Sequence, residues 1–176
     1  MGYWFLIVCV LAGLFAFYLR SSARRSRSDR LCALFGLDSS EWRLLGSDLG
    51  GGEDKLFLRG DGLVGVPDAL FASRDGSRIL VGEAKVRHFK ARRGRPRVRP
   101  YERFQVQLYM GLAARRYRCQ VQSIIRYGDG CLVPVDADPE EYRYLLTLRA
   151  PFRRATSKMS SRSVHSPSAS GVLPRH

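Results

Sequence analysis

The sequence predicts an α/β fold in which helices flank a central mixed sheet, with one transmembrane helix ahead of it. Three observations lead to this prediction: an uncharged apolar stretch at residues 2–19, short apolar segments separated by glycine turns, and two helical patterns placed among those segments. A length of 176 residues allows one domain with appendages, and a hydrophobic content of 45% is enough for one packed core.

Residues 2–19 predict a membrane-spanning helix. At 1.5 Å per residue this helix would be about 27 Å long, close to the hydrocarbon thickness of a bilayer. Tyr3 and Trp4 at one end and Tyr18 at the other fit the aromatic belts of a membrane. The alternative, a cleaved signal peptide, needs a basic region before the apolar run and an A-x-A-like cleavage site, and the sequence has neither.

The charge that follows the apolar stretch predicts its orientation. Five arginines occur within residues 20–30, whereas no charged side chain lies within the apolar run. Positively charged flanks stay on the cytoplasmic side. We therefore expect a single-pass protein with its N-terminus outside and residues 20–176 in the cytoplasm. This part divides into a basic juxtamembrane linker at 20–30, a domain at 31–150 and a disordered basic tail at 151–176.

The first half of the domain predicts short helices followed by strands. Residues 31–46 favour one or two short helices. A hairpin of residues 55–59 and 63–72 and a third strand at 78–86 follow, separated by Asp-Gly turns. These closely spaced strands indicate an antiparallel meander.

The second half predicts a helix, two strands and a final helix. The helix begins near Tyr101, and 3.6-residue periodicity places Phe104, Leu108, Leu112 and Ala113 on its apolar face. Strands are expected at 120–127 and 131–135, and the last helix at 138–150, with an N-capping aspartate, a proline and acids in its first turn.

The charge balance predicts a polyanionic partner. The net charge is +14 and the isoelectric point is about 10.4, which fits nucleic acid or an anionic membrane surface. Nearly all the cations are arginines, whose guanidinium groups bind phosphate with two hydrogen bonds. Between residues 87 and 103 a basic loop supplies the expected DNA contacts: Lys90, Arg92, Arg93, Arg95, Arg97 and Arg99. The alternative is a merely solvated charged loop.

Three short fragments carry the candidate chemistry. Asp68 ends the sequence GVPD, in the centre of the expected second strand, and Glu83 and Lys85 share a face near the end of the third. An acid within an apolar strand is costly unless it is paired or binds a metal, and two convergent carboxylates suit Mg²⁺ or Mn²⁺. Gln105 and Tyr109 share one helix face because they are four residues apart.

Each fragment alone is common on strand ends and helix surfaces. Together they occur in a fixed order at strand, strand and helix, with spacings of 15 and 20 residues. In that order GVPD, EAK and QVQLY resemble the motifs G-h-x-D, (D/E)-h-K and Q-h-x-x-Y of the RecB-like branch of the PD-(D/E)XK nuclease superfamily. The resemblance covers residues 53–148 and is closest to the exonucleases of CRISPR spacer acquisition and to the nuclease domain of a replication helicase–nuclease.

This resemblance implies a restriction-endonuclease-like fold and an exonuclease-like, Mg²⁺- or Mn²⁺-dependent deoxyribonuclease acting on single- or double-stranded DNA. It also implies that Asp68 and Glu83 are metal ligands, assisted by the Ala84 carbonyl. Lys85 would be the catalytic lysine, and Gln105 and Tyr109 the helix motif.

Two features depart from the family pattern. The family often has a further acidic or histidine ligand on a preceding helix, for which Glu41 and Glu53 are the candidates here. The iron–sulfur branch uses four cysteines, and we expect no cluster because the chain has only three outside the apolar stretch and no C-x-x-C pair: Cys32, Cys119 and Cys131, with Cys9 inside it.

The sequence also leaves two alternative functions open. The chain could be a catalytically inactive nuclease-fold protein that binds nucleic acid, or one that binds an anionic membrane surface through its arginines. His88 is a further candidate base, although it lies off the motifs.

Overall fold

The computed structural model describes residues 2–49, 54–89 and 98–148. A helix at residues 139–148 follows the last strand. The elements before it are, in order, α1 (Gly2–Leu34), β1 (Trp42–Ser47), β2 (Leu58–Gly60), β3 (Leu63–Gly65), β4 (Ala69–Ser73), β5 (Arg78–Lys85), α2 (Pro100–Tyr117), β6 (Gln120–Tyr127) and β7 (Leu132–Asp136).

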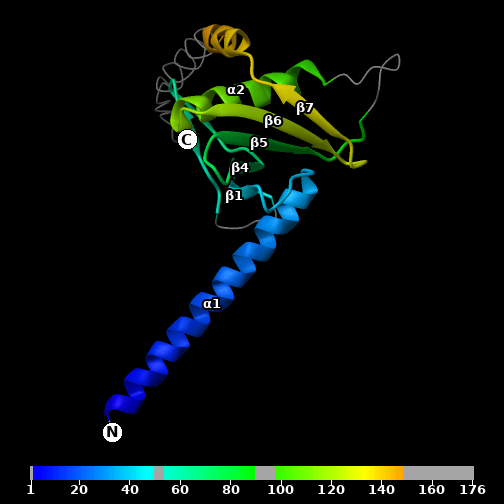
Figure 1. Ribbon diagram of the computed structural model, residues 1–176. Helices are drawn as coiled ribbons and strands as arrows, with labels where there is room; N and C mark the ends of the chain where they lie inside the picture. The colour runs from blue at the N-terminus through cyan, green and yellow to red at the C-terminus, as the bar shows by residue number, and fades with distance from the viewer. Residues whose placement is uncertain (1, 50–53, 90–97, 149–176) are drawn as a thin grey trace, which may run out of the picture.

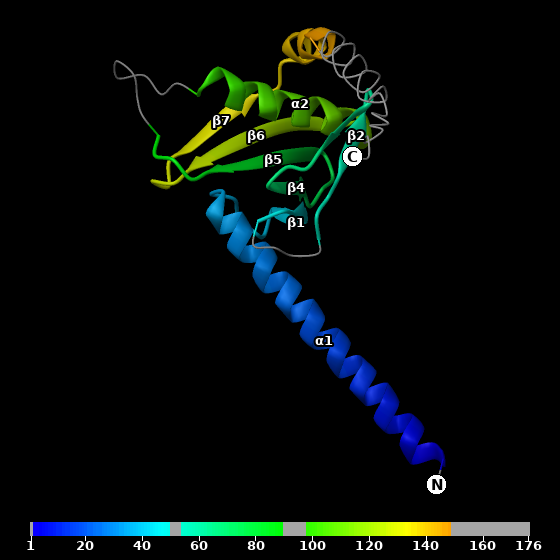
Figure 2. The same cartoon turned by 180° about the vertical axis from the view of Figure 1, so that it is seen from behind.

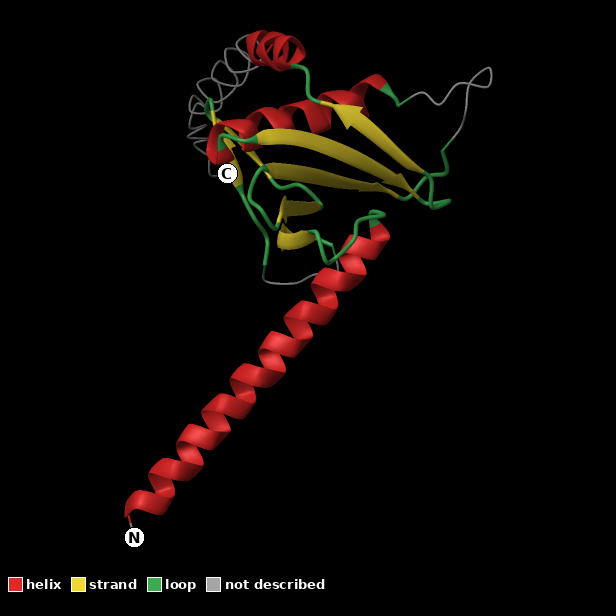
Figure 3. Ribbon diagram, viewed as in Figure 1, coloured by secondary structure: helices red, strands yellow, loops and turns green. Residues whose placement is uncertain are grey.

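A five-stranded mixed sheet forms the centre of the domain, with the strand order β1-β4-β5-β6-β7. Neighbouring strands are antiparallel except β5 and β6, which are parallel because α2 connects them. Figure 1 shows α2 lying across one face of this sheet, and Figure 3 shows the strands between the helices. The predicted α/β architecture, a mixed sheet flanked by helices, is therefore confirmed.

Each face of the sheet has its own apolar core. Under α2, the buried side chains of Leu70, Val81 and Ile125 pack against Val106 and Met110 of the helix. On the opposite face, the C-terminal end of α1 and the residue Phe35 just after it pack on the sheet. They form the second core, which consists of Cys32, Phe35, Trp42, Ala69, Phe71 and Leu80. Both faces of β4 and β5 are thus covered, which explains their nearly continuous apolar sequences.

Residues 20–30, the expected juxtamembrane linker, are helical and continue α1 toward the domain. Side chains of this segment contact the domain. Arg27 donates from Nη2 to the Leu49 carbonyl at 3.0 Å, and Ser28 Oγ accepts the N–H of Leu44 on the edge strand β1 at 3.2 Å. Within the expected membrane span, the structure describes the side chains of residues 9–15 and 17–19 only. Over the described residues, no helix meets the length and apolarity that a membrane crossing requires.

The prediction of short helices over residues 31–46 was wrong in its second half. Helix α1 ends at Leu34, followed by Gly36 with a φ of 67°, and Trp42–Ser47 form strand β1. Trp42 is 5% exposed and belongs to the second core. Burial of this side chain and pairing with β4 favour the strand over the local helical pattern.

The expected strand at residues 63–72 is divided, so the three strands do not form one meander. Residues 66–68 separate β3 from β4, since Pro67 has no N–H to donate to a sheet. Strands β2 and β3 form a two-stranded hairpin outside the main sheet. Figure 2 shows β2 beside the C-terminal part of α2, where Leu112 lies close to Gly60. Asp68 therefore precedes β4 and does not lie within a strand.

The apolar face predicted for the first helix of the domain was only partly right. Leu112 and Ala113 are buried, whereas Phe104 is 37% exposed. The true buried side includes Val106 and Met110 because α2 is covered both by the sheet and by the β2–β3 hairpin. The four cysteines are free thiols; Cys32 is buried and Cys119 and Cys131 are partly buried.

Candidate active site

The five sequence-predicted site residues meet where β5 ends beneath the first turns of α2. Alternation along β5 places Glu83 and Lys85 on the face that α2 covers. The four-residue spacing of Gln105 and Tyr109 turns both toward these two side chains. Asp68, just before β4, lies beside the end of β5.

The Gln105 side chain is the centre of the hydrogen-bond network. Its Oε1 accepts a 2.8 Å bond from Lys85 Nζ, and its Nε2 donates a 2.8 Å bond to Glu83 Oε1. The same Nε2 lies 3.3 Å from the Tyr109 hydroxyl. Lys85 Nζ also forms a 2.8 Å ion pair with Glu83 Oε1. One amide thus fixes the cation and the carboxylate relative to each other.

Asp68 is held by hydrogen bonds from β5 and from the end of β1, the two strands on either side of β4. Its Oδ2 accepts the Ala84 N–H at 2.7 Å, which ties its carboxylate to the strand that carries Glu83 and Lys85. The Asp68 carbonyl accepts bonds from Ser47 Oγ at 2.7 Å and from the Asp48 N–H at 3.0 Å. The carboxylate is therefore fixed although Asp68 lies outside regular structure.

The two carboxylates are electrostatically under-compensated. Glu83 is 3% exposed, and its Oε2 is buried without a hydrogen-bond partner among the described residues. Burial raises the pKa of Glu83, with a further contribution from the negative charge of Asp68, against the hydrogen bond from Lys85. Burial likewise raises the pKa of Asp68, against the Ala84 hydrogen bond. A bound cation would relieve both effects.

These oxygen donors fit a Mg²⁺-type site, in which water supplies several of the ligands, better than a site in which the protein supplies all of them. In the described part of the chain, no group of three or more His, Cys, Asp or Glu side chains is placed to hold a metal. Mg²⁺ is commonly held by one or two carboxylates and keeps several waters. Asp68 and the orphaned Oε2 of Glu83 match that pattern, so the residues present fit Mg²⁺ or Mn²⁺.

Asp48 is a further acid that the sequence did not indicate. It follows β1 directly, contacts Asp68 through its main-chain N–H and contributes to the raised pKa of Asp68. Its own carboxylate is paired with Lys55 Nζ at 2.6 Å. Of the two acids considered from the sequence, Glu53 lies outside the described residues. Glu41 precedes Trp42, at the end of β1 opposite to Asp48.

Gly65 is a second residue whose role appears only in three dimensions. A Cβ added there would lie 2.5 Å from Tyr109 Cε1. The glycine of the GVPD sequence therefore allows the Tyr109 ring to lie against the chain next to Asp68.

Of the six expected DNA-binding residues, the structure describes only Arg99. Lys90, Arg92, Arg93, Arg95 and Arg97 lie outside the described residues, whereas Arg99 is exposed at the start of α2. The chain on either side of this segment is tied together, because Arg87 Nε donates to the buried Glu102 carboxylate at 2.8 Å. His88 is exposed and forms none of the contacts of the five-residue network.

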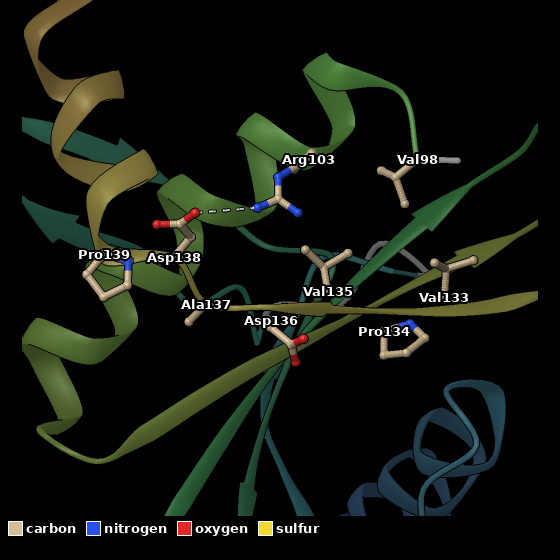
Figure 4. Close-up of a pocket in the computed structure, with 9 residues that line it drawn as sticks. All are labelled: Val98, Arg103, Val133, Pro134, Val135, Asp136, Ala137, Asp138 and Pro139. Atoms are coloured by element: carbon tan, nitrogen blue, oxygen red, sulfur yellow. Dashed lines mark ion pairs between the residues drawn. The ribbon is translucent and has the colours of Figure 1, made fainter. Parts of the chain in front are cut away.

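A hollow of about 610 Å³ lies along β7 and the start of α2, and none of the five site residues lines it. Figure 4 shows it between Val98, the strand β7 and the start of the last helix, with Arg103 paired to Asp138 at 3.7 Å. The candidate chemistry is therefore separate from this hollow and rests on the Asp68–Tyr109 network.

Comparison of the chain with protein-family models, with curated proteins and with solved structures finds no match. The RecB-like resemblance therefore stays a prediction from three motifs, and the geometry of the site is the basis for a functional proposal.

Proposed function

We propose that this protein is a membrane-anchored, Mg²⁺- or Mn²⁺-dependent DNA nuclease with a restriction-endonuclease-like fold of the RecB-like type. The observation that carries the proposal is the hydrogen-bond network of Glu83, Lys85, Gln105 and Tyr109, with the Asp68 carboxylate bound to the N–H of the intervening Ala84. Beside this network, the buried Oε2 of Glu83 has no partner among the described residues. Such perturbed, clustered carboxylates are characteristic of catalytic sites.

The metal would be held by Asp68 and Glu83, with the Ala84 carbonyl as a further ligand. When bound, it would polarise a scissile phosphate and lower the pKa of an attacking water. Lys85 has three Nζ protons, and its bonds to Glu83 and Gln105 use two of them. The third is available to orient water or to stabilise negative charge developing on the phosphate. Gln105 positions Lys85, and Tyr109 positions Gln105.

The membrane anchor is supported by the exposure of apolar side chains along α1. The described large apolar side chains from Val10 to Leu19 are 52–72% exposed, and the sequence contains no charge from residue 2 to residue 19. An uninterrupted apolar helix with this exposure is suited to a lipid environment. Carbonate-resistant membrane association of the full chain, lost on deletion of residues 2–19, tests the anchor. Protease treatment of intact spheroplasts tests the cytoplasmic placement of the domain.

The nuclease activity is tested with the full-length chain in mild detergent and labelled single- and double-stranded DNA. We expect cleavage with Mg²⁺ or Mn²⁺, none with chelator, and loss of cleavage in Lys85→Ala but not in Arg143→Ala, which removes a cation on the last helix. Equal cleavage by wild type and Lys85→Ala would show that the assigned mechanism is wrong.

The same assays separate the alternatives. Salt-dependent DNA binding without cleavage in either metal would indicate a catalytically inactive nucleic-acid-binding protein. Binding of the domain to anionic liposomes without DNA binding would instead indicate a membrane-surface role.

A further inference from the structure

Tyr101 lies on the same face of α2 as the catalytic helix motif. The residues Tyr101, Gln105 and Tyr109 follow one another at four-residue spacing, so they form one row along the helix. Gln105 and Tyr109 are partly buried in the network, whereas Tyr101 is 56% exposed. Tyr101 is therefore the outermost member of this row, one turn from Gln105. The adjacent Phe104 is also exposed, at 37%.

The Tyr101 side chain is fixed although it is exposed. Its hydroxyl accepts a 3.2 Å bond from Arg99 Nη1 and lies 3.4 Å from Glu102 Oε1. Glu102 is fully buried, and Arg87 and Tyr127 both donate to its carboxylate. The aromatic ring is thus held in place through its hydroxyl, which reduces the conformational entropy lost when a ligand packs on its face.

We propose that Tyr101, together with Phe104, stacks on a base of the substrate strand while Arg99 contacts a neighbouring phosphate. This inference rests on the proposed nuclease function and adds two specificity-determining residues to it. Aromatic stacking on an unpaired base strengthens binding by roughly 5- to 150-fold per base, and a duplex does not expose its base faces in this way. The platform therefore selects strand segments whose bases are unpaired.

Charge complementarity supports a nucleic-acid occupant for this surface. A single exposed aromatic residue is ordinary on a protein surface. Here two aromatic residues lie within one turn of Gln105, beside the exposed Arg99, in a chain of net charge +14. An aromatic surface flanked by guanidinium groups is suited to bases and phosphates together.

The test compares binding to oligonucleotides with and without bases. Fluorescence anisotropy with the full-length chain in mild detergent and excess chelator measures affinity for labelled oligothymidylate of about 16 nucleotides and for an abasic strand of equal length. We expect wild type to bind oligothymidylate about tenfold more tightly. The double variant Tyr101→Ala/Phe104→Ala should lose this ratio while keeping its affinity for the abasic strand. Tyr101→Phe, which keeps the ring, should retain most of it.

Tyr144→Ala is the matched control, because Tyr144 is 58% exposed on the last helix. It should leave the ratio unchanged. Equal affinity of wild type for the two strands, or an equal loss for both strands in the double variant, would overturn the inference. Cleavage by wild type without any base preference would remove only this inference and leave the nuclease proposal intact. A base preference without cleavage in either metal would support this inference and contradict the nuclease proposal.

Discussion

Lys85 and Gln105, 20 residues apart in the chain, are joined by a 2.8 Å hydrogen bond from Nζ to Oε1. This bond determines the orientation of the Gln105 amide, whose Nε2 then donates to Glu83 and contacts Tyr109. In the proposed mechanism Gln105 is therefore a positioning residue for both the lysine and the carboxylate.

Replacement of Gln105 by glutamate should impair turnover more than substrate binding. The new carboxylate would lie against Glu83 Oε1, to which the Gln105 amide now donates a hydrogen bond. We expect kcat to fall by about 100-fold with little change in KM, because the loss concerns alignment of Lys85 and Glu83. Steady-state kinetics with Mg²⁺ measures the two parameters separately.

Gln107→Ala is the matched control for this variant. Gln107 is 1% exposed, and its amide joins the Asp136 carbonyl and the Asp138 N–H instead of the site. Its loss should lower stability by about 1–3 kcal/mol while leaving kcat per folded molecule unchanged. An equal effect of both variants on kcat would mean that Gln105 has only a structural role.

Metal binding should stabilise the folded protein through Glu83. The buried Oε2 of Glu83 has no partner among the described residues, so a cation there compensates a charge that is now unfavourable. At a free concentration 100 times its dissociation constant, a ligand stabilises the folded state by about 2.7 kcal/mol. This raises Tm by roughly 5–10 °C for a domain of this size. Thermal denaturation with Mn²⁺ and then chelator measures this rise. Glu83→Gln should abolish it, and Glu140→Gln, on the last helix, should not.

Much of the fold was predictable because its strongest local signals agree with the tertiary packing. Strand β6 was expected at its observed limits, and the start of helix α2 was expected at Tyr101, one residue after its observed start at Pro100. Strand β1 was missed because Trp42 and Leu44 favour strand only through burial against α1 and pairing with β4. A pattern of six residues does not contain that long-range information.

The proximity of the candidate site residues was predictable for a different reason. Their order and spacing led us to expect Asp68, Glu83 and Lys85 close together, and the structure places them so, even though the local structure of Asp68 was misjudged. Asp48 was not found, because its proximity to Asp68 depends on pairing of β1 with β4. The sequence contained Gly65 in the GVPD motif but did not indicate its role. Its closeness to Tyr109 brings together two segments that are far apart in sequence.

Gly65→Ala should damage the site through Tyr109. The added methyl would lie 2.5 Å from Cε1 and 2.8 Å from Cδ1 of that ring, so the ring has to move. We expect a loss of about 1–3 kcal/mol in stability and a clear loss of cleavage. In Gly60→Ala, on the same hairpin, the methyl meets only a Leu112 methyl at 3.1 Å. Activity assays on both variants should show a loss in Gly65→Ala alone.

The Glu102 cluster should make stability fall in acid. Burial opposes ionisation of Glu102, but hydrogen bonds from Arg87 and Tyr127 outweigh it and lower the pKa of Glu102 below its ordinary value. A lowered folded-state pKa contributes stability above the unfolded-state value of about 4.3, and this contribution is lost as the pH falls through the folded-state pKa.

Glu102→Gln tests this contribution because it removes the charge and keeps the shape. We expect a loss of about 3 kcal/mol at pH 7, since Arg87 loses its buried partner. Urea denaturation between pH 7 and pH 3 should show that the difference between variant and wild type shrinks toward acid. The raised pKa values of Asp68 and Glu83 act in the opposite direction in both proteins, so the difference isolates Glu102. A pH-independent difference would contradict the assignment.

The arginine-rich segment should account for much of the salt dependence of DNA binding. Each phosphate contact contributes about 0.7 to the slope of log affinity against log salt for single strands. Replacement of the cations between residues 90 and 97 by serine should therefore reduce this slope by about 2–3 if most of them bind phosphate. The replaced positions are Lys90, Arg92, Arg93, Arg95 and Arg97.

A matched variant carries five serines in place of the arginines at positions 149, 153, 154, 162 and 175, which lie C-terminal to the described residues. Anisotropy titrations at several salt concentrations, with chelator to prevent cleavage, measure the slope for both variants. A slope that falls equally in both would show that binding reflects net charge alone. A fall confined to residues 90–97 would assign the phosphate contacts to the segment that joins Lys85 to the helix carrying Gln105 and Tyr109.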